Sequence, residues 1–198
     1  MHNFIAIEGI DGSGKTETAK VLADRLKGGY FFTPPKEYQQ IREYINNDAP
    51  PESRLLYYLS SVIDISNRIK RNIHKKDSVC DRYIWSTIVY YSVIENKELD
   101  YVKRIVEPFI HCIVQPTKNV LLTVSEKEQI RRLNYRNKGF HTLTDKLSIY
   151  DDNFRKKIYN TYQTVTKEGE WIKVDTTNKS INSIIDEIIK KCNIGGTK

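Results

Sequence analysis

Cysteine is scarce in this chain, and its spacing excludes two classes of protein. The three cysteines, Cys80, Cys112 and Cys192, are an odd number and form neither a CxxC pair nor a Cys/His ligand pattern. They predict no disulfide framework and no structural zinc site. The four histidines form no ligand pattern either. A reducing compartment, the cytoplasm, is the expected location.

Long apolar runs and low-complexity segments are lacking as well. No run approaches the ~18 to 20 apolar residues that a membrane helix needs, and Glu8 interrupts the first apolar stretch, which in a secretory signal would stay apolar. Nine glycines and six prolines in 198 residues are too few for a collagen-like or disordered chain. We expect a single domain over residues 1–198 that has no membrane partner.

The charge of the chain is positive but scattered. It has 32 Lys and Arg against 25 Asp and Glu, which gives a net charge of +7. Such an excess can serve nucleic acid, anionic lipid or small polyphosphate ligands. The basic residues occur in pairs, such as Lys75-Lys76 and Lys156-Lys157, rather than in one stripe. Pairs of this kind are typical of solvated helix faces, so nucleic acid is not the expected partner.

Short apolar strands alternate with helical patterns along the sequence. Strands are expected over residues 4–7, 30–33, 78–81, 119–124 and 171–174. Helices are expected over residues 16–26, 36–46, 52–74, 83–94, 101–113, 126–136, 147–167 and 181–192. Ser125 and Glu128 predict a capping box, and the polar segment 137–145 predicts a mobile loop. The alternation predicts an α/β fold, a three-layer α/β/α sandwich of about five parallel strands.

One octapeptide between the first strand and the first helix carries a phosphate-binding pattern. The pattern GxxxxGK[ST] is formed by Gly9, Ile10, Asp11, Gly12, Ser13, Gly14, Lys15 and Thr16. Its glycines let backbone N–H groups point inward at a helix N-terminus, where the helix dipole favours anions. Lys15 would bridge the terminal phosphates, and the Thr16 hydroxyl would hold Mg²⁺. The chain is therefore predicted to be a P-loop NTPase that binds a nucleoside triphosphate.

A second motif lies at the end of the third expected strand. Asp81, Arg82 and Tyr83 follow the apolar residues Val79 and Cys80. In a P-loop fold this position lies beside the glycine-rich loop, so Asp81 can orient Mg²⁺ or the attacking oxygen. Arg82 would face the cleft at the height of the transferred phosphoryl group. No guanine-reading NKxD segment is evident, so a GTPase is not expected.

Three segments together resemble the thymidylate kinase family. They are residues 4–16, residues 79–83 and residues 125–136, which look like its P-loop, its Asp-Arg-aromatic motif and the helix that enters its lid. The order and spacing of the motifs hold over nearly the whole chain. The resemblance implies the P-loop kinase fold, with a short lid at about residues 137–147.

The resemblance also implies roles for single residues. Asp11 is where this family contacts the 3′-hydroxyl of the acceptor sugar, and Arg82 is where it grips the acceptor phosphate. Gly12 stands where some members carry a catalytic arginine, so the lid must supply one. Arg132 and Arg136, four apart on one helix face, match the lid positions best and would neutralise charge on the migrating phosphoryl group.

The acceptor side departs from the family pattern in two places. Residues 33–36 read Thr-Pro-Pro-Lys where the family usually has Thr-Arg-Glu-Pro, and residues 55–61 lack the arginine that ends a similar run in relatives. Candidates to compensate are Lys36, Arg42, Arg54 and Arg68. Tyr57, Tyr58 and Tyr90 are candidates to stack on an acceptor base, although aromatic residues at helical spacing also suit a core.

The sequence thus predicts a Mg²⁺-dependent kinase. The γ-phosphoryl group of ATP would pass to a nucleoside monophosphate, dTMP or a similar pyrimidine deoxynucleotide. One alternative is a kinase of a nucleoside or of another small metabolite. A second alternative is a P-loop protein without catalysis that binds nucleotide or nucleic acid. The resemblance further implies a homodimer, with the helix over 52–74 as the contact.

Overall fold

The central sheet appears where the alternation of strands and helices predicts it. The computed structural model describes residues 2–136 and 143–194. In this part of the chain five parallel strands form one sheet, in the order β2-β3-β1-β4-β5. The strands are β1 (Phe4–Gly9), β2 (Gly29–Phe32), β3 (Ser78–Asp81), β4 (Lys118–Thr123) and β5 (Trp171–Asp175). The predicted α/β sandwich is confirmed.

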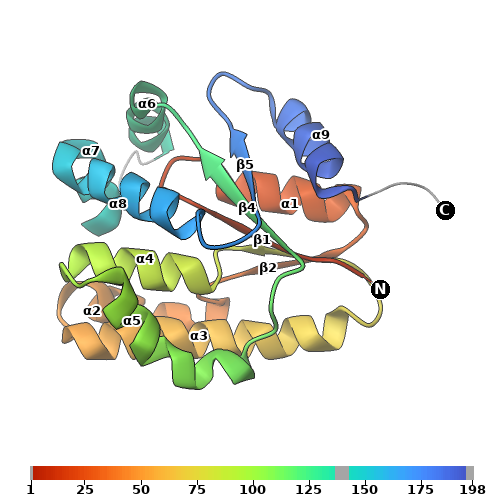
Figure 1. Cartoon of the computed structure of the whole chain (residues 1–198). Helices are drawn as coiled ribbons and strands as arrows, with labels where there is room; N and C mark the ends of the chain where they lie inside the picture. Colours follow the sequence, from red (N-terminus) through yellow and green to blue (C-terminus); the bar gives the residue numbers. More distant parts are fainter. Residues whose placement is uncertain (1, 137–142, 195–198) are drawn as a thin grey trace.

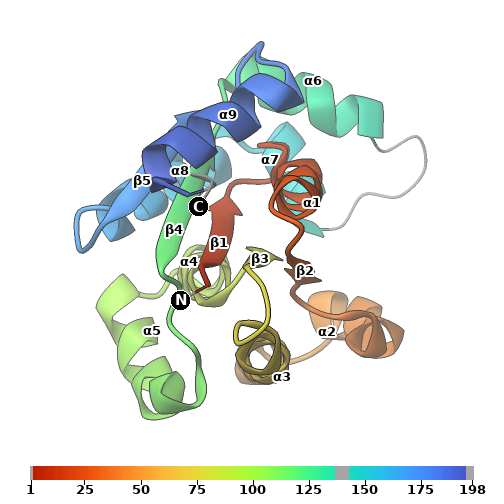
Figure 2. The ribbon, with the colours of Figure 1, turned by 90° about the vertical axis from the view of Figure 1, so that its right-hand side faces the viewer.

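Helices cover both faces of the sheet (Figure 1). One face carries α1 (Lys15–Arg25) and α9 (Ile181–Cys192). The other carries α3 (Pro51–Asn72), α4 (Ile84–Ile94), α5 (Leu99–Val106) and α8 (Asp152–Val165). Figure 2 shows the two layers from the side, with α1 and α9 above the strands and α3 and α5 below them. Among the described residues, no helix combines the length and the apolar character that a membrane crossing requires.

The strand β1 lies in the middle of the sheet and is buried on both faces. Phe4 and Ala6 belong to the apolar cluster beneath α3 and α4, whereas Ile5 and Ile7 pack in the cluster beneath α1 and α9. This alternation follows from the two-residue period of a strand. Because the strands are parallel, the loops that follow β1 and β3 meet at one edge of the sheet, where ligands of such folds bind.

Two expected helices are shorter than the sequence pattern suggests. The helix expected over 101–113 ends at Val106 and continues as the 3₁₀ segment η2 (Glu107–Cys112). Pro108 lacks a backbone N–H and does not fit the interior of an α-helix. The helix expected over 147–167 is divided into α7 (Leu143–Tyr150) and α8. Asp151 has extended backbone angles, and its side chain caps α8 by accepting from the Phe154 N–H.

Two local expectations after β2 and β4 also change. The helix expected over 36–46 forms as a 3₁₀ segment, η1 (Lys36–Ile41), and a short α2 (Arg42–Asn47), with Ile45 as the buried side chain of α2. So small an apolar face gives little support to a longer helix. At the start of α6 (Glu126–Arg136) the predicted capping box is replaced. The Ser125 N–H donates to Thr177 Oγ1, and Glu128 accepts hydrogen bonds from Arg131 and Arg132.

The expected lid lies partly outside the described residues. Of its span of about 137–147, residues 137–142 are not described. The remaining residues form the first part of α7. Of the mobile loop expected over 137–145, residues 143–145 are therefore helical instead, and residues 137–142 lie outside the described part of the chain.

Candidate active site

The glycine-rich loop, residues 9–16, joins β1 to α1. Gly9, Gly12 and Gly14 have φ angles of 144°, 80° and 87°. Residues other than glycine rarely adopt backbone angles in this region. A Cβ atom at Gly9 would also collide with the backbone oxygen of Leu122 on the neighbouring strand. The loop therefore needs glycine at these positions, and it leads directly into the N-terminus of α1, as an anion site requires.

Lys15 is the first residue of α1 and is buried although it is a cation. Its Nζ donates to the backbone oxygen of Ile10 at 2.6 Å, so the side chain folds back over the loop. Burial, with a further contribution from the nearby Arg82, lowers the pKa of Lys15 to about 7. A phosphate group at this position would supply the negative charge that the desolvated ammonium lacks.

Thr16 and Asp81 bring the glycine-rich loop and the end of β3 together. Thr16 Oγ1 donates to Asp81 Oδ2 at 2.5 Å. The other carboxylate oxygen, Asp81 Oδ1, is buried and accepts no hydrogen bond from the described residues. A buried carboxylate oxygen without a partner is costly in isolation and suits a bound cation. The two side chains predicted to hold Mg²⁺ therefore lie in contact.

Arg82 is held in one orientation beside the loop. Its backbone φ angle is 64°, a left-handed conformation that is uncommon for residues other than glycine. The guanidinium forms an ion pair with Asp11 and lies 5.0 Å from the centre of the Tyr90 ring. The Tyr90 hydroxyl donates to the other oxygen of Asp11 at 3.0 Å. Asp11, Arg82 and Tyr90 thus form one polar cluster on the wall of the cleft.

Glu8 supports this cluster from below and was not predicted from the sequence. It is fully buried in β1 and accepts hydrogen bonds from the backbone N–H groups of Tyr83 at 3.0 Å and Ser86 at 3.2 Å, and from the Ser86 hydroxyl. These contacts satisfy N–H groups in the first turn of α4 and fix the chain next to Arg82. Burial raises the pKa of Glu8, although the Ser86 hydroxyl opposes the shift.

A cleft of about 770 Å³ connects these groups. It is bounded by the glycine-rich loop and α1, by the ends of β2 and β3, and by α3, α4 and α6. Asp11, Lys15, Thr16, Asp81 and Arg82 all line it. Its volume is in the range of sites for small organic ligands.

The three tyrosines expected near an acceptor base occupy different places. Tyr58 and Tyr90 line the cleft, and the Tyr58 hydroxyl donates to Asn46 Oδ1 at 2.7 Å. Tyr57 instead lies behind the wall, where its ring packs against Tyr38 and its hydroxyl donates to the Tyr38 backbone oxygen. The expected contact of Tyr57 with an acceptor is therefore corrected to a packing role. Consecutive helix residues point about 100° apart, and of this pair Tyr58 is the one that lines the cleft.

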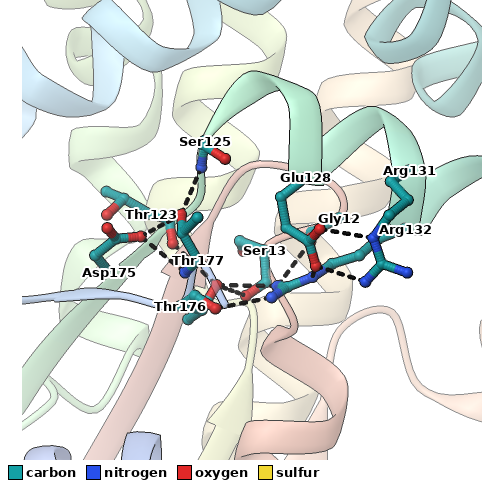
Figure 3. A network of polar contacts seen from close by, with 10 residues as sticks. All are labelled: Gly12, Ser13, Thr123, Ser125, Glu128, Arg131, Arg132, Asp175, Thr176 and Thr177. Atoms are coloured by element: carbon teal, nitrogen blue, oxygen red, sulfur yellow. Dashed lines mark hydrogen bonds and ion pairs between the residues drawn. The ribbon is translucent and has the colours of Figure 1, made fainter. Parts of the chain in front are cut away.

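Arg132 on α6 reaches across to the glycine-rich loop (Figure 3). Its guanidinium donates to the backbone oxygen of Thr176 at 2.8 Å and to Thr176 Oγ1 at 3.0 Å, and it approaches the backbone oxygen of Gly12 at 3.4 Å. Glu128 accepts from Arg132 Nε at 2.8 Å, and hydrogen bonds from Arg131 and Arg132 lower the pKa of Glu128 to about 2. Arg136 ends α6, and its side chain lies outside the described part of the chain.

Thr176 is a second residue that the sequence did not reveal. It is fully buried just after β5, and its hydroxyl contacts the backbone oxygens of Ser13 at 3.1 Å and Thr123 at 3.0 Å. The segment after β5 is thereby tied to the glycine-rich loop. The signal in the sequence is weak, because a threonine after a strand is common in exposed turns as well.

Comparisons with known proteins agree on one family. The family model described as thymidylate kinase matches residues 7–188. A probable thymidylate kinase from Methanococcus maripaludis is 32% identical over an alignment of 204 residues, which covers 96% of this chain and 94% of the relative.

Two solved structures are similar at lower sequence identity. A thymidylate kinase from Candida albicans has a TM-score of 0.74 at 21% identity, with 97% of this chain and 92% of that chain covered. A deoxyadenosine kinase from M. mycoides has a TM-score of 0.68 at 16% identity, with 96% and 98% covered. These two likenesses show a common fold.

Proposed function

The chain belongs to the thymidylate kinase family, and we propose that it transfers the γ-phosphoryl group of ATP to the 5′-phosphate of dTMP in the cleft described above. The observation that carries this proposal is the meeting of the glycine-rich loop with Asp81 and Arg82 on one cleft. The other kinase acceptors and the role without catalysis are not favoured, because the family match extends over residues 7–188.

The donor would bind at the glycine-rich loop. The backbone N–H groups of residues 9–16 and the N-terminus of α1 would cradle the phosphates of ATP. Lys15 would leave the Ile10 oxygen and place its ammonium against the terminal phosphates, which restores the charge that burial disfavours. Alignment and charge, rather than covalent chemistry, account for most of the catalysis in such transfers.

Thr16 and Asp81 would hold Mg²⁺. Mg²⁺ supplies positive charge to the phosphate oxygens when bound. The donor set fits the ion, since both residues offer oxygen and Asp81 Oδ1 is buried without a hydrogen-bond partner among the described residues. The described part of the chain contains no cluster of three or more His, Cys, Asp or Glu side chains that could hold a metal ion. Few protein ligands and several phosphate or water oxygens are the usual arrangement for Mg²⁺.

The acceptor would bind between the Arg82 cluster and α3. Arg82 would exchange part of its contact with Asp11 for the acceptor phosphate, and Asp11 would then be available to the 3′-hydroxyl of the sugar. Tyr58, which faces the cleft, would contact the base. Arginine suits the phosphate because its planar fork matches two oxygens at once.

Arg132 and Arg136 would neutralise charge on the migrating phosphoryl group. Support for Arg132 is its position on the cleft and its approach to the Gly12 oxygen at 3.4 Å. Arg136 follows four residues later on the same helix. Positive charge placed in advance near the transferred group is typically the largest contribution to such catalysis.

A homodimer through α3 and a location in the cytoplasm remain parts of this proposal. In support of the first, Leu56 on α3 is 52% exposed although it is a large apolar side chain. Light scattering of the wild-type protein and of a Leu56→Glu variant would test the contact, since a charge there should shift a dimer toward monomer. A cytoplasmic location fits the nucleotide substrates.

A coupled assay for ADP release tests the proposed reaction. The wild-type enzyme, ATP and Mg²⁺ are combined in turn with dTMP, other nucleoside monophosphates and thymidine. We expect the highest kcat/KM with dTMP. A higher value with thymidine would favour a nucleoside kinase, and ATP binding without turnover of any acceptor would favour a binding protein.

A further inference from the structure

The cationic side chains on the cleft differ in how they are neutralised. Three arginines there form ion pairs with carboxylates inside the protein: Arg54 with Glu95, Arg82 with Asp11, and Arg132 with Glu128. The other three cations that line the cleft, among the residues described, are Lys15, Lys20 and Arg42. Lys15 already has its proposed role at the donor phosphates, and Lys20 is an exposed residue of α1. Arg42 is the arginine on the cleft that forms no ion pair with a carboxylate among the described residues and has no role yet.

Arg42 is half-buried on the acceptor side of the cleft. Its Nη1 donates to Gln39 Oε1, a neutral oxygen, at 3.2 Å. Its Nε is buried and has no hydrogen-bond partner among the described residues. A buried guanidinium N–H without an acceptor costs free energy, more than a neutral donor would, until an acceptor binds there. An anion in the cleft would supply that acceptor.

Hydrogen bonds through the segment after β2 connect the Arg42 side chain to the backbone of Arg82. Thr33 Oγ1 donates to the Arg82 backbone oxygen at 3.1 Å, and the next residue, Pro34, accepts from Gln39 Nε2 at 3.0 Å. Gln39 in turn accepts from Arg42. The two arginines are thus linked through the segment that follows β2, and residues 33, 34, 39, 42 and 82 all line the cleft.

The charge of the acceptor requires more than Arg82 alone. A phosphate monoester carries about −1.5 to −2 charges at pH 7, whereas Arg82 is already paired with Asp11. Arg54 is unsuitable, because it donates to Glu95 and to the backbone oxygens of Ile45 and Ala49.

We propose that Arg42 binds the 5′-phosphate of the acceptor nucleotide together with Arg82. This inference rests on the proposed function, since it assigns a residue of this chain to the acceptor side of that cleft. Arg68 and Lys36 do not line the cleft, and Arg68 is paired with Glu37 and Asp64. Arg42 is therefore the residue through which this chain gains acceptor-phosphate affinity without an arginine at position 34.

The experiment compares ligands that differ by the phosphate alone. Calorimetric titrations with dTMP and with thymidine are made on the wild-type protein and on Arg42→Ala, Arg42→Lys and Arg68→Ala. A hydrogen bond to a charged group typically contributes about 1.5 to 3 kcal/mol, so Arg42→Ala should weaken dTMP binding about 10- to 100-fold. Thymidine binding should stay unchanged. Arg42→Lys should fall between the two, because it keeps the charge and loses the fork, and Arg68→Ala should match the wild type.

Each other outcome overturns the assignment. If Arg42→Ala binds dTMP with wild-type affinity, Arg42 does not contact the acceptor phosphate. An equal loss of dTMP and thymidine affinity shows a structural or base-binding role instead. Turnover of dTMP by the wild type and by Arg42→Ala is measured in parallel, so that the proposed function is tested separately. If the wild type turns over dTMP and Arg42→Ala does so with an unchanged KM, only the role of Arg42 is contradicted. A wild-type protein that neither binds nor turns over dTMP contradicts both.

Discussion

The hydroxyl of Thr16 donates a hydrogen bond of 2.5 Å to the carboxylate of Asp81, although 65 residues separate them in the chain. The contact joins the glycine-rich loop of β1 to the carboxyl end of β3, since these two strands are neighbours in the sheet. It leaves Asp81 Oδ1 buried and free of hydrogen bonds from the described residues.

Asp81→Asn should lower the affinity for Mg²⁺ while the protein stays folded. The amide removes the negative charge that would face the ion, so we expect about a 10- to 100-fold higher Mg²⁺ concentration at half-maximal rate. Asp77→Asn is the matched control, because Asp77 contacts Asn3 near the opposite end of β3. Mg²⁺ titrations of the kinase rate measure the effect. An unchanged half-saturation in Asp81→Asn would contradict the proposed metal site.

ATP binding should take up protons above neutral pH. The pKa of Lys15 is about 7 in the free protein, so at pH 8 most Lys15 side chains are neutral. Phosphates beside Lys15 favour its charged form, and binding at pH 8 should therefore take up a proton at this residue. The affinity for ATP should fall as the pH rises above 7, because free Lys15 loses its proton there.

Calorimetry in two buffers of different ionisation enthalpy measures this uptake. Lys15→Arg is the control, since arginine stays charged at every pH in the range and takes up no proton. Equal proton uptake in the wild type and in Lys15→Arg would show that another group titrates.

Arg82→Ala should impair the acceptor side far more than the donor side. Loss of a preorganised donor to phosphate typically lowers the rate by about 10²- to 10³-fold, and we expect kcat/KM for dTMP to fall accordingly. The Kd for ATP should change little, because the donor contacts are assigned to the glycine-rich loop. Arg82→Lys should recover part of the rate. Steady-state kinetics and ATP titrations separate the two effects, and equal losses would argue against the acceptor role of Arg82.

Glu8→Ala should destabilise the protein by about 3 kcal/mol, because it leaves the buried N–H groups of Tyr83 and Ser86 without an acceptor. Glu8→Gln keeps one acceptor oxygen and should cost less. The pKa of Glu8 is raised in the folded protein, so its contribution to stability is present below pH 4.5 and is lost as the pH rises through the folded pKa. Urea unfolding of the wild type and Glu8→Gln at several pH values measures this. The stability advantage of the wild type should shrink as the pH rises; an advantage that grows would contradict the raised pKa.

The strands and the glycine-rich loop could be predicted because their signals are local. The spacing of Gly9, Gly14 and Lys15 encodes a backbone conformation and a charge within eight residues, and β3 follows from four consecutive residues, Ser78 to Asp81. The break at Pro108 could also have been predicted from the missing N–H of proline. The cap at Asp151 is less evident, since aspartate also occurs inside helices.

The remaining features depend on contacts between distant parts of the chain. Glu8 matters because it accepts hydrogen bonds from α4, and Thr176 matters because its hydroxyl donates to the glycine-rich loop. The choice between Tyr57 and Tyr58 depends on the rotation of α3 about its axis, which packing decides. Arg42 could be named as one of four candidates, but only the positions of their partners separate it from Arg54 and the others.

Transfer of a labelled phosphoryl group tests the central claim most directly. ATP that carries an isotopic label in its γ-phosphoryl group is incubated with dTMP, Mg²⁺ and either the wild-type protein or Lys15→Ala. Mass spectrometry of the products should find the label in the β-phosphate of dTDP with the wild type and none there with Lys15→Ala. Label that appears in inorganic phosphate alone, or dTDP formed at an undiminished rate by Lys15→Ala, would contradict the account.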